Sequence, residues 1–322
     1  MEILATIGKS TKSSDIEKCI KNLIAQDIDC FRFNLSKYSN YQEINQLADE
    51  ICAIKEKYAL NIMLDIPFPY RKPRIFLKEG NMIPLSKNDT IFIFVGLNES
   101  IYTDSSEILQ LCIGDRIYYD NGIIWRVTGV FENNISIISE VDCLVFNGKS
   151  INFNKLILNT PVYPFISIIN KIQPHSVALS FVMCADEITE VKQNINSDIE
   201  VVCKIETEAS VNNIKEIASS NSCAGLMIAR GDLMIYADYR YLYSYQNRIF
   251  AEAKKYGKKT YFATGILSSL CSGAIPTQAE IIDLSKIVEC SPTGIVLNAG
   301  IVRNNIELAR NIIYTTIQQV RP

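Results

Sequence analysis

Eight short apolar segments recur along the chain, and helical periodicity separates most of them. Near-continuous apolar strands that alternate with helices are typical of a parallel sheet covered on both faces. Eight repeats of this unit predict an α/β fold, the closed (β/α)₈ or TIM barrel, rather than an open sheet. The expected strands span residues 2–7, 30–35, 61–66, 176–182, 200–205, 224–229, 259–263 and 294–297.

The alternation of strands and helices stops between residues 70 and 159, where turn signals separate segments rich in Ile, Val, Phe and Tyr. Asn121-Gly122 between two apolar runs is a strong hairpin signal. We therefore predict an inserted all-β, β-barrel-like lid domain, 70–159, after the third barrel strand. The (β/α)₈ catalytic domain would consist of residues 1–69 and 160–322.

The composition argues against several classes of function. The net charge is −3 and the charges are dispersed, so the chain lacks the basic stripe that nucleic-acid binding requires. No segment is long enough to span a membrane, and the N-terminus does not resemble a signal peptide, so we expect a cytoplasmic protein with no membrane partner. Ten cysteines without a C-x-x-C pair indicate reduced side chains, and the single histidine, His175, leaves little material for a serine–histidine triad.

Charged and polar side chains gather at the ends of the predicted strands, where catalytic groups lie in this architecture. Lys204 and Glu206 are two residues apart, so both face the same side of one strand. An isolated Lys-x-Glu is usually a simple ion pair, but polar residues at the ends of five strands favour a functional site. These residues are Arg32, Asn34, Ser36, Asp65, Lys204, Glu206, Asp232 and Thr264.

The donor atoms in this set are carboxylates and neutral oxygens, without histidine or cysteine. Such donors suit a hard divalent cation such as Mg²⁺ or Mn²⁺. The backbone amides after Arg230-Gly231-Asp232 would hold a carboxylate or phosphate if a helical turn begins there, and glycine permits its close approach. The sequence therefore predicts a metal-assisted anion site.

Several segments, in this order and spacing, resemble those of the pyruvate kinase family over most of the chain. The Lys-x-Glu and Ala-Arg-Gly-Asp-Leu segments are specific as a pair and weak singly. An inserted β domain after the third strand belongs to the same resemblance. The matching segments are Ala5-Thr6-Ile7-Gly8, Arg32-Phe33-Asn34-Leu35-Ser36, Leu64-Asp65, Cys203-Lys204-Ile205-Glu206-Thr207, residues 225–233, Ala263-Thr264 and Pro276-Thr277-Gln278-Ala279-Glu280.

The resemblance implies a role for each matching residue. It makes Lys204, Thr264 and Arg32 catalytic: Lys204 would neutralise the phosphoryl group and the enolate, Arg32 would bind the phosphate, and Thr264 would take part in proton transfer at the substrate carbon. The metal ligands would be Glu206 and Asp232. The amides of Gly231 and Asp232, together with Thr264, would bind substrate. A monovalent-cation site, with K⁺ as the candidate, is implied at Asn34, Ser36 and Asp65.

The resemblance is weaker around the nucleotide site of the family. Residues 65–72 lack the lysine, glutamate and terminal arginine of the family segment. Lys72 would supply the lost charge and Lys149 matches a nucleotide-phosphate lysine, so both are expected to contact ADP or ATP. The given sequence ends after the eighth helix, and we expect the family's C-terminal regulatory domain to be absent. Any homo-oligomer would then form through barrel surfaces.

Three functions follow as hypotheses. The first is a pyruvate kinase-like phosphotransferase that uses phosphoenolpyruvate and pyruvate. One version of this hypothesis has a non-standard phosphoryl acceptor in a specialised pathway. The second is a lyase, decarboxylase or transferase that forms the enolate of a 2-oxo acid. The third is a catalytically inactive scaffold. The first ranks highest because a drifting scaffold has no reason to keep every charged residue around the metal.

Overall fold

The computed structural model describes residues 1–9, 13–38, 40–68, 72–96, 99–119, 123–153 and 162–321. The chain divides into two compact units. One unit consists of Met1–Pro69 and Thr160–Pro322, and the other of Tyr70–Asn159. Each unit has a hydrophobic core of its own.

The first unit is a closed barrel of eight parallel strands, in which β1 pairs with both β2 and β17. The TIM barrel prediction is confirmed. Two strands end earlier than expected, because Leu35 opens a 3₁₀ turn and Phe181 has a left-handed backbone with φ of 55°. The strands are β1 (Glu2–Ile7), β2 (Cys30–Asn34), β3 (Asn61–Ile66), β13 (Ser176–Leu179), β14 (Glu200–Ile205), β15 (Gly225–Ala229), β16 (Lys259–Ala263) and β17 (Gly294–Leu297).

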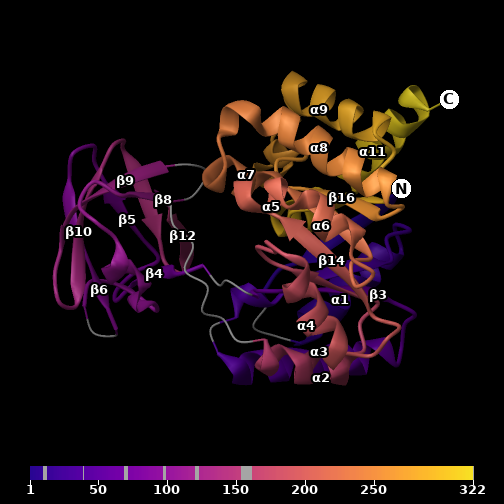
Figure 1. Cartoon of the computed structure of the whole chain (residues 1–322), viewed down its shortest axis with the longest axis horizontal. Helices are drawn as coiled ribbons and strands as arrows, with labels where there is room; N and C mark the ends of the chain where they lie inside the picture. Colours follow the sequence, from indigo (N-terminus) through magenta and orange to yellow (C-terminus); the bar gives the residue numbers. More distant parts are fainter. Residues whose placement is uncertain are drawn as a thin grey trace. The chain divides into compact units, whose positions relative to one another are not determined.

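Helices surround the barrel strands, as Figure 1 shows. Apolar stripes on these helices pack against the outward-facing side chains of the strands and form the main core. The longer helices are α1 (Ser13–Ile24), α2 (Tyr41–Lys55), α3 (Tyr163–Ile172), α4 (Ala185–Asn194), α8 (Leu242–Lys255), α9 (Gln278–Glu289) and α11 (Ile306–Val320). Shorter helical segments are η1 (Leu35–Lys37), α5 (Glu208–Asn212), α6 (Ile214–Ser219), α7 (Arg230–Tyr236), η3 (Tyr239–Tyr241), η4 (Ser268–Ser272) and α10 (Ala299–Asn304).

An apolar layer fills the interior of the barrel. Every strand contributes to it, and the layer consists of Leu4, Cys30, Met63, Ala178, Val202, Met227, Tyr261, Ala263 and Val296. Side chains two residues apart on a strand face the same way, so the next inward positions lie one step nearer the C-terminal mouth. Six of these positions are polar: the exposed Asn298, and five that contact one another, Thr6, Arg32, Asp65, Ser180 and Lys204. The fold thus places a polar layer directly above a packed apolar one.

The second unit follows β3 and is built from β-strands. Seven strands close into a small barrel in the order β10-β6-β7-β4-β12-β8-β9, and β5 pairs with β11. The predicted turn at Asn121-Gly122 lies outside the described residues, but β8 and β9 on either side of it pair antiparallel. The elements are β4 (Arg74–Leu77), β5 (Met82–Leu85), β6 (Thr90–Val95), β7 (Ile101–Thr103), η2 (Ser106–Gln110), β8 (Arg116–Tyr119), β9 (Ile123–Val130), β10 (Asn134–Ser139), β11 (Cys143–Phe146) and β12 (Lys149–Phe153).

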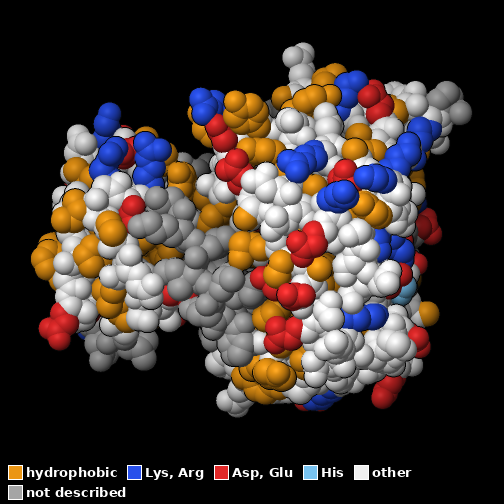
Figure 2. Space-filling view, viewed as in Figure 1, with side chains coloured by type: hydrophobic (Ala, Val, Ile, Leu, Met, Phe, Trp, Pro, Cys, Tyr) orange, Lys and Arg blue, Asp and Glu red, His pale blue; other side chains and the backbone are white. Residues whose placement is uncertain are grey.

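The surface carries both signs of charge. On the face shown in Figure 2, lysine and arginine side chains lie among aspartate, glutamate and scattered hydrophobic side chains. Within the described part of the chain, no helix has the length and apolar character that crossing a membrane would need.

Candidate active site

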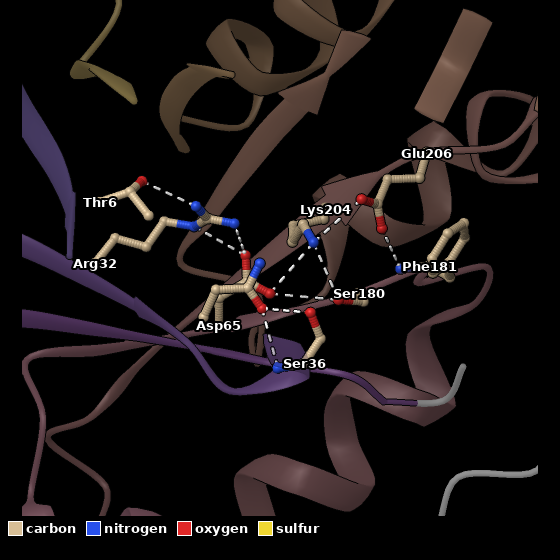
Figure 3. A network of polar contacts seen from close by, with 9 residues as sticks. Thr6, Arg32, Ser36, Asp65, Ser180, Phe181, Lys204 and Glu206 are labelled. Atoms are coloured by element: carbon tan, nitrogen blue, oxygen red, sulfur yellow. Dashed lines mark hydrogen bonds and ion pairs between the residues drawn. The ribbon is translucent and has the colours of Figure 1, made fainter. Parts of the chain in front are cut away.

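The polar layer at the barrel mouth forms one connected network, drawn in Figure 3. Its members come from different strands: Thr6 from β1, Arg32 from β2, Asp65 from β3 and Lys204 from β14. Thr6 lies opposite Arg32 in the register of β1 and β2, and Asn34 lies opposite Asp65 in that of β2 and β3. Strand register therefore brings together residues that are far apart in sequence.

Asp65 is the centre of this network, and its side chain is only 1% exposed. Arg32 donates from Nε and Nη2 to Asp65 Oδ2, at 2.9 and 2.6 Å. Lys204 Nζ lies 3.2 Å from Asp65 Oδ1. Burial alone would raise the pKa of the Asp65 carboxyl, but the charges of Lys204 and Arg32 outweigh burial and lower that pKa. One ionised carboxylate thus holds two cations side by side.

Lys204 also pairs with Glu206, the residue that follows β14. The distance from Lys204 Nζ to Glu206 Oε1 is 3.1 Å, and the Phe181 amide donates to Glu206 Oε2 at 2.6 Å. Burial alone would lower the pKa of the Lys204 ammonium, but Asp65 and Glu206 outweigh burial and raise it. Lys204 is therefore a buried cation that stays charged at neutral pH.

Glu206 and Asp232 are the expected metal ligands. Glu206 is buried, and Asp232 in the first turn of α7 is close enough to contribute to the raised pKa of Lys204. Among the described residues, no group of three or more His, Cys, Asp or Glu side chains is arranged to hold a metal. Two carboxylates nevertheless fit Mg²⁺ or Mn²⁺, because Mg²⁺ usually keeps several waters or substrate oxygens in its coordination shell.

The charge at the mouth supports the same fit. Arg32 and Lys204 contribute two positive charges, while Asp65, Glu206 and Asp232 contribute three negative ones. An anionic ligand would meet a net negative site without a cation. A divalent cation would reverse the sign.

Thr264 follows β16 and has a left-handed backbone with φ of 71°. Such a conformation is rare for a β-branched residue and costs free energy. Gly231 packs against its side chain: a Cβ at position 231 would lie 2.6 Å from Thr264 Cγ2. The helix α7 begins at Arg230, so the amides of Gly231 and Asp232 lie in a first turn, where N–H groups lack intrahelical acceptors.

The three residues expected to bind a monovalent cation lie on neighbouring segments. Asn34 Oδ1 accepts hydrogen bonds from the Ser36 backbone N at 3.0 Å and from Ser36 Oγ at 2.7 Å. Asp65 is on the adjacent strand, where Arg32 and Lys204 already share its carboxylate. A cation bound here would share Asp65 with those two side chains.

The two expected nucleotide contacts, Lys72 and Lys149, belong to the second unit. Lys72 precedes β4, and Lys149 is the first residue of β12. The Lys149 ammonium lies 6.0 Å from the centroid of the Phe146 ring.

Thr6 and Ser180 are not predicted from the sequence. Arg32 Nη1 donates to Thr6 Oγ1 at 3.0 Å, and Lys204 Nζ donates to Ser180 Oγ at 3.0 Å. Ser180 Oγ in turn donates to Asp65 Oδ1 at 3.4 Å. The two-residue periodicity of the strands could have identified both, since each lies two positions after a residue of the apolar layer.

A cavity of about 400 Å³ beside the ends of β1 and α10 is also not predicted. Lys9 and Arg303 contribute positive charge to its lining, and Asp15 contributes a carboxylate. Lys9 Nζ pairs with Glu43 at 2.8 Å. The Gly8-Lys9 pair directly after a strand is the sequence signal that could have identified it.

Comparison with known proteins agrees with this architecture. A family model described as the barrel domain of pyruvate kinase matches residues 1–300. The chain is 26% identical over 301 residues to the pyruvate kinase of Trypanoplasma borreli, covering 89% of this chain and 59% of that protein. It is 28% identical over 309 residues to that of Thermococcus litoralis and 29% identical over 304 residues to that of Methanocaldococcus jannaschii. Each match covers 89% of this chain and 62% of the relative, so the chain spans about three fifths of these proteins.

Proposed function

We propose that this chain, which belongs to the pyruvate kinase family, is a divalent-metal-dependent phosphotransferase acting on phosphoenolpyruvate or pyruvate. The observation that carries the proposal is the buried network in which Asp65 holds Arg32 and Lys204 side by side, with Glu206 next to Lys204. Buried cations held at fixed positions are what a phosphoryl group requires, because its transfer depends on positioning and charge stabilisation.

Arg32 and Lys204 would bind and neutralise the transferring phosphoryl group. In the forward direction the bond from phosphorus to the enol oxygen breaks, and a bond from phosphorus to an acceptor oxygen forms. Lys204 would also stabilise the negative charge left on the enolate oxygen. Its ammonium needs no reorganisation for this role, because Asp65, Glu206 and Ser180 already orient it.

Glu206 and Asp232 would hold the divalent cation, Mg²⁺ or Mn²⁺. When bound, the cation would neutralise charge on the substrate oxygens at a mouth whose own side chains are net negative. Asn34, Ser36 and Asp65 are the proposed site for K⁺. Both assignments come from the family resemblance, and they are supported by the position of these residues at or just after the C-terminal ends of barrel strands.

Thr264 would take part in the proton transfer that converts the enolate to the ketone. The enolate carbon gains a proton, and the reverse reaction removes it. The amides of Gly231 and Asp232 would hold the substrate carboxylate at the start of α7. A Cβ at position 231 would lie 2.6 Å from Thr264 Cγ2, so a larger residue there would displace Thr264 relative to the bound carboxylate.

The phosphoryl acceptor is proposed to be a nucleoside diphosphate, with ADP and ATP as the reaction pair. On the family resemblance, Lys72 and Lys149 are its proposed contacts.

A coupled assay with phosphoenolpyruvate, Mg²⁺, K⁺ and a panel of nucleoside diphosphates tests the proposal. We expect turnover with at least one acceptor, and its loss in Lys204→Met. Lys286→Met is the matched control, because Lys286 is an exposed lysine of α9 that pairs with Glu289 on the same helix. Absence of product with every acceptor would contradict the phosphotransferase.

One observation supports a second candidate, an enolate-forming lyase, decarboxylase or transferase on a 2-oxo acid. All members of the Asp65 network belong to the barrel unit. The groups that would stabilise an enolate are therefore assembled without the proposed nucleotide contacts. Uptake of solvent deuterium into the methyl group of pyruvate in the absence of nucleotide would favour this candidate, and strict dependence on nucleotide would remove its rationale.

A further inference from the structure

The loop after β16, which carries Thr264, has an unusually constrained backbone. Thr264, Gly265 and Leu267 have φ values of 71°, 80° and 50°. Glycine adopts such values readily, but threonine and leucine do so only where the surroundings enforce them. Something outside the loop must therefore hold it.

Arg230 provides one of these restraints. It is 9% exposed, and its guanidinium donates from Nε and Nη2 to the carbonyl oxygen of Thr264, at 3.1 and 2.7 Å. Two donors converge on the same backbone atom from the first residue of the neighbouring helix α7. Gly265 does not crowd this contact. An added Cβ there would lie 3.4 Å from Arg230 Nη2, which is an ordinary van der Waals distance.

Asp283 of α9 anchors the other edge of the same guanidinium. Arg230 Nη1 donates to Asp283 Oδ1 at 2.6 Å and to Oδ2 at 2.8 Å. A second carboxylate of α9, Glu280, accepts from the backbone N of Ser269 at 2.8 Å and from its Oγ at 2.6 Å. The N-terminal half of α9 therefore restrains both ends of the segment 264–269.

We propose that Arg230 and Asp283 are positioning residues that hold Thr264 in its left-handed conformation and so orient its hydroxyl. Asp283 fixes Arg230, Arg230 fixes the Thr264 carbonyl, and the Thr264 side chain rests against Gly231. The part of the inference that concerns catalysis rests on the proposed role of Thr264 in proton transfer. The part that concerns conformation does not.

Asp283 is the better residue to change. Its side chain is 35% exposed, whereas that of Arg230 is 11% exposed. Water can reach the position of the partly exposed Asp283 carboxylate, so its removal should disturb the fold less than removal of Arg230 would. Asp283→Ala removes both the charge and the acceptors, and Asp283→Asn keeps an acceptor without the charge. Asp27→Asn is the matched control, because Asp27 also pairs with an arginine, Arg310, at a distance of 2.6 Å. Neither residue belongs to β16 or to the loop that follows it.

The first measurement reads the position of Thr264 directly. In protein labelled with ¹³C at threonine methyl groups, the Thr264 signal is assigned by its loss in Thr264→Ser. We expect this signal to shift in Asp283→Ala, to shift less in Asp283→Asn, and to stay unchanged in Asp27→Asn. An unshifted Thr264 signal in Asp283→Ala would overturn the positioning role, whether or not the protein has any activity.

The second measurement reads the proton transfer, as deuterium uptake into the pyruvate methyl group under conditions in which the unmodified chain is active. We expect Asp283→Ala to lower the rate by about 10- to 100-fold, the scale for a displaced catalytic group, with KM changed by less than about twofold. In a Thr264→Ala background the same substitution should change the rate by less than about twofold, because Asp283 acts only through Thr264. Equal losses in both backgrounds would overturn the catalytic part.

The two proposals fail in different ways. If the unmodified chain neither transfers phosphoryl groups nor exchanges pyruvate hydrogens, the proposed function and the catalytic part fail together. The methyl signal of Thr264 still decides the positioning role in that case. If the unmodified chain is active and Asp283→Ala matches it, only the further inference is wrong.

Discussion

The two ends of the barrel interior carry similar side chains in different environments. At the base, Lys259 Nζ lies 2.7 Å from both Glu200 carboxylate oxygens, and their side chains are 36% and 28% exposed. At the mouth, Asp65 is 1% exposed and shares its carboxylate between Arg32 and Lys204. Strand β14 contributes to both ends, with Glu200 at its start and Lys204 near its end.

The difference lies in solvation, because the Glu200 carboxylate also has two basic neighbours, Lys259 and, at 3.7 Å, His175. A partly exposed pair gains little net free energy, because water screens it and would otherwise solvate both ions. A buried network is costly to desolvate and becomes strongly destabilising once one member is removed. The charges at the base are therefore partly solvated, whereas those at the mouth form a buried, preformed set.

The largest expected effect is that of Asp65→Asn on stability. We expect the free energy of unfolding to fall by about 3–5 kcal/mol, because Arg32 and Lys204 would remain as buried cations without their shared counter-ion. Glu200→Gln at the base should cost about 0–1 kcal/mol. Urea unfolding should be followed by circular dichroism at 222 nm, since the single Trp125 reports on the other unit. Similar losses for both variants would contradict the comparison.

The next effect concerns glycines at the two ends. Gly231→Ala should lower turnover about 100-fold, because its methyl group would displace Thr264. Adding Thr264→Ser removes the clashing Cγ2 and should restore most of the activity. At the base, Gly225→Ala would bring a methyl group to 3.0 Å from Lys259 Cβ, so it should lower stability and leave turnover per folded molecule unchanged. Failure of Thr264→Ser to rescue Gly231→Ala would show that the contact does not control activity.

A smaller effect is expected from Mg²⁺ on stability. Ligand that binds only the folded state at ten times its Kd stabilises it by about 1.4 kcal/mol. We expect Mg²⁺ to raise the unfolding midpoint of the unmodified chain and of Glu200→Gln, but not that of Glu206→Gln. A shift retained in Glu206→Gln would place the cation elsewhere.

The smallest effect separates the two ends by the sign of their pH dependence. The folded-state pKa of Asp65 is below 3.8, so its stabilising contribution is lost as the pH falls through that lowered pKa. At the base, partial burial raises the pKa of the Glu2 carboxyl above 4.5, although Lys259 opposes the shift. The contribution of Glu2 to stability is therefore lost as the pH rises through this raised pKa. Glu2→Gln should remove this pH dependence and so flatten the pH–stability profile where the Glu2 carboxyl titrates. A pH–stability profile identical to that of the unmodified chain would contradict this assignment.

Much of the barrel could be predicted, because each strand is a short apolar run and helical periodicity separates most of these runs. Both are features of the local sequence. The predicted bounds 2–7, 61–66, 200–205, 259–263 and 294–297 are those of β1, β3, β14, β16 and β17. The expected strand 176–182 is three residues too long, because Phe181 adopts a left-handed backbone. A bulky apolar residue rarely adopts this conformation, so the sequence does not predict it. The capping box of Thr277 and Glu280 begins α9, yet the second role of Glu280, bonding to Ser269, has no local signature.

The amino-acid sequence by itself determined the strand-and-helix order and the residues that face inward. It also placed charged side chains at the strand ends, because alternation along a strand is a local property. Only the tertiary structure decided that Arg32 and Lys204 share Asp65, that Thr6 and Ser180 complete the network, and that Asp283 reaches Thr264 through Arg230. Those contacts depend on strand register and on packing between distant segments. The interaction free energy that offsets the desolvation of the buried charges arises only when all the partners are in place.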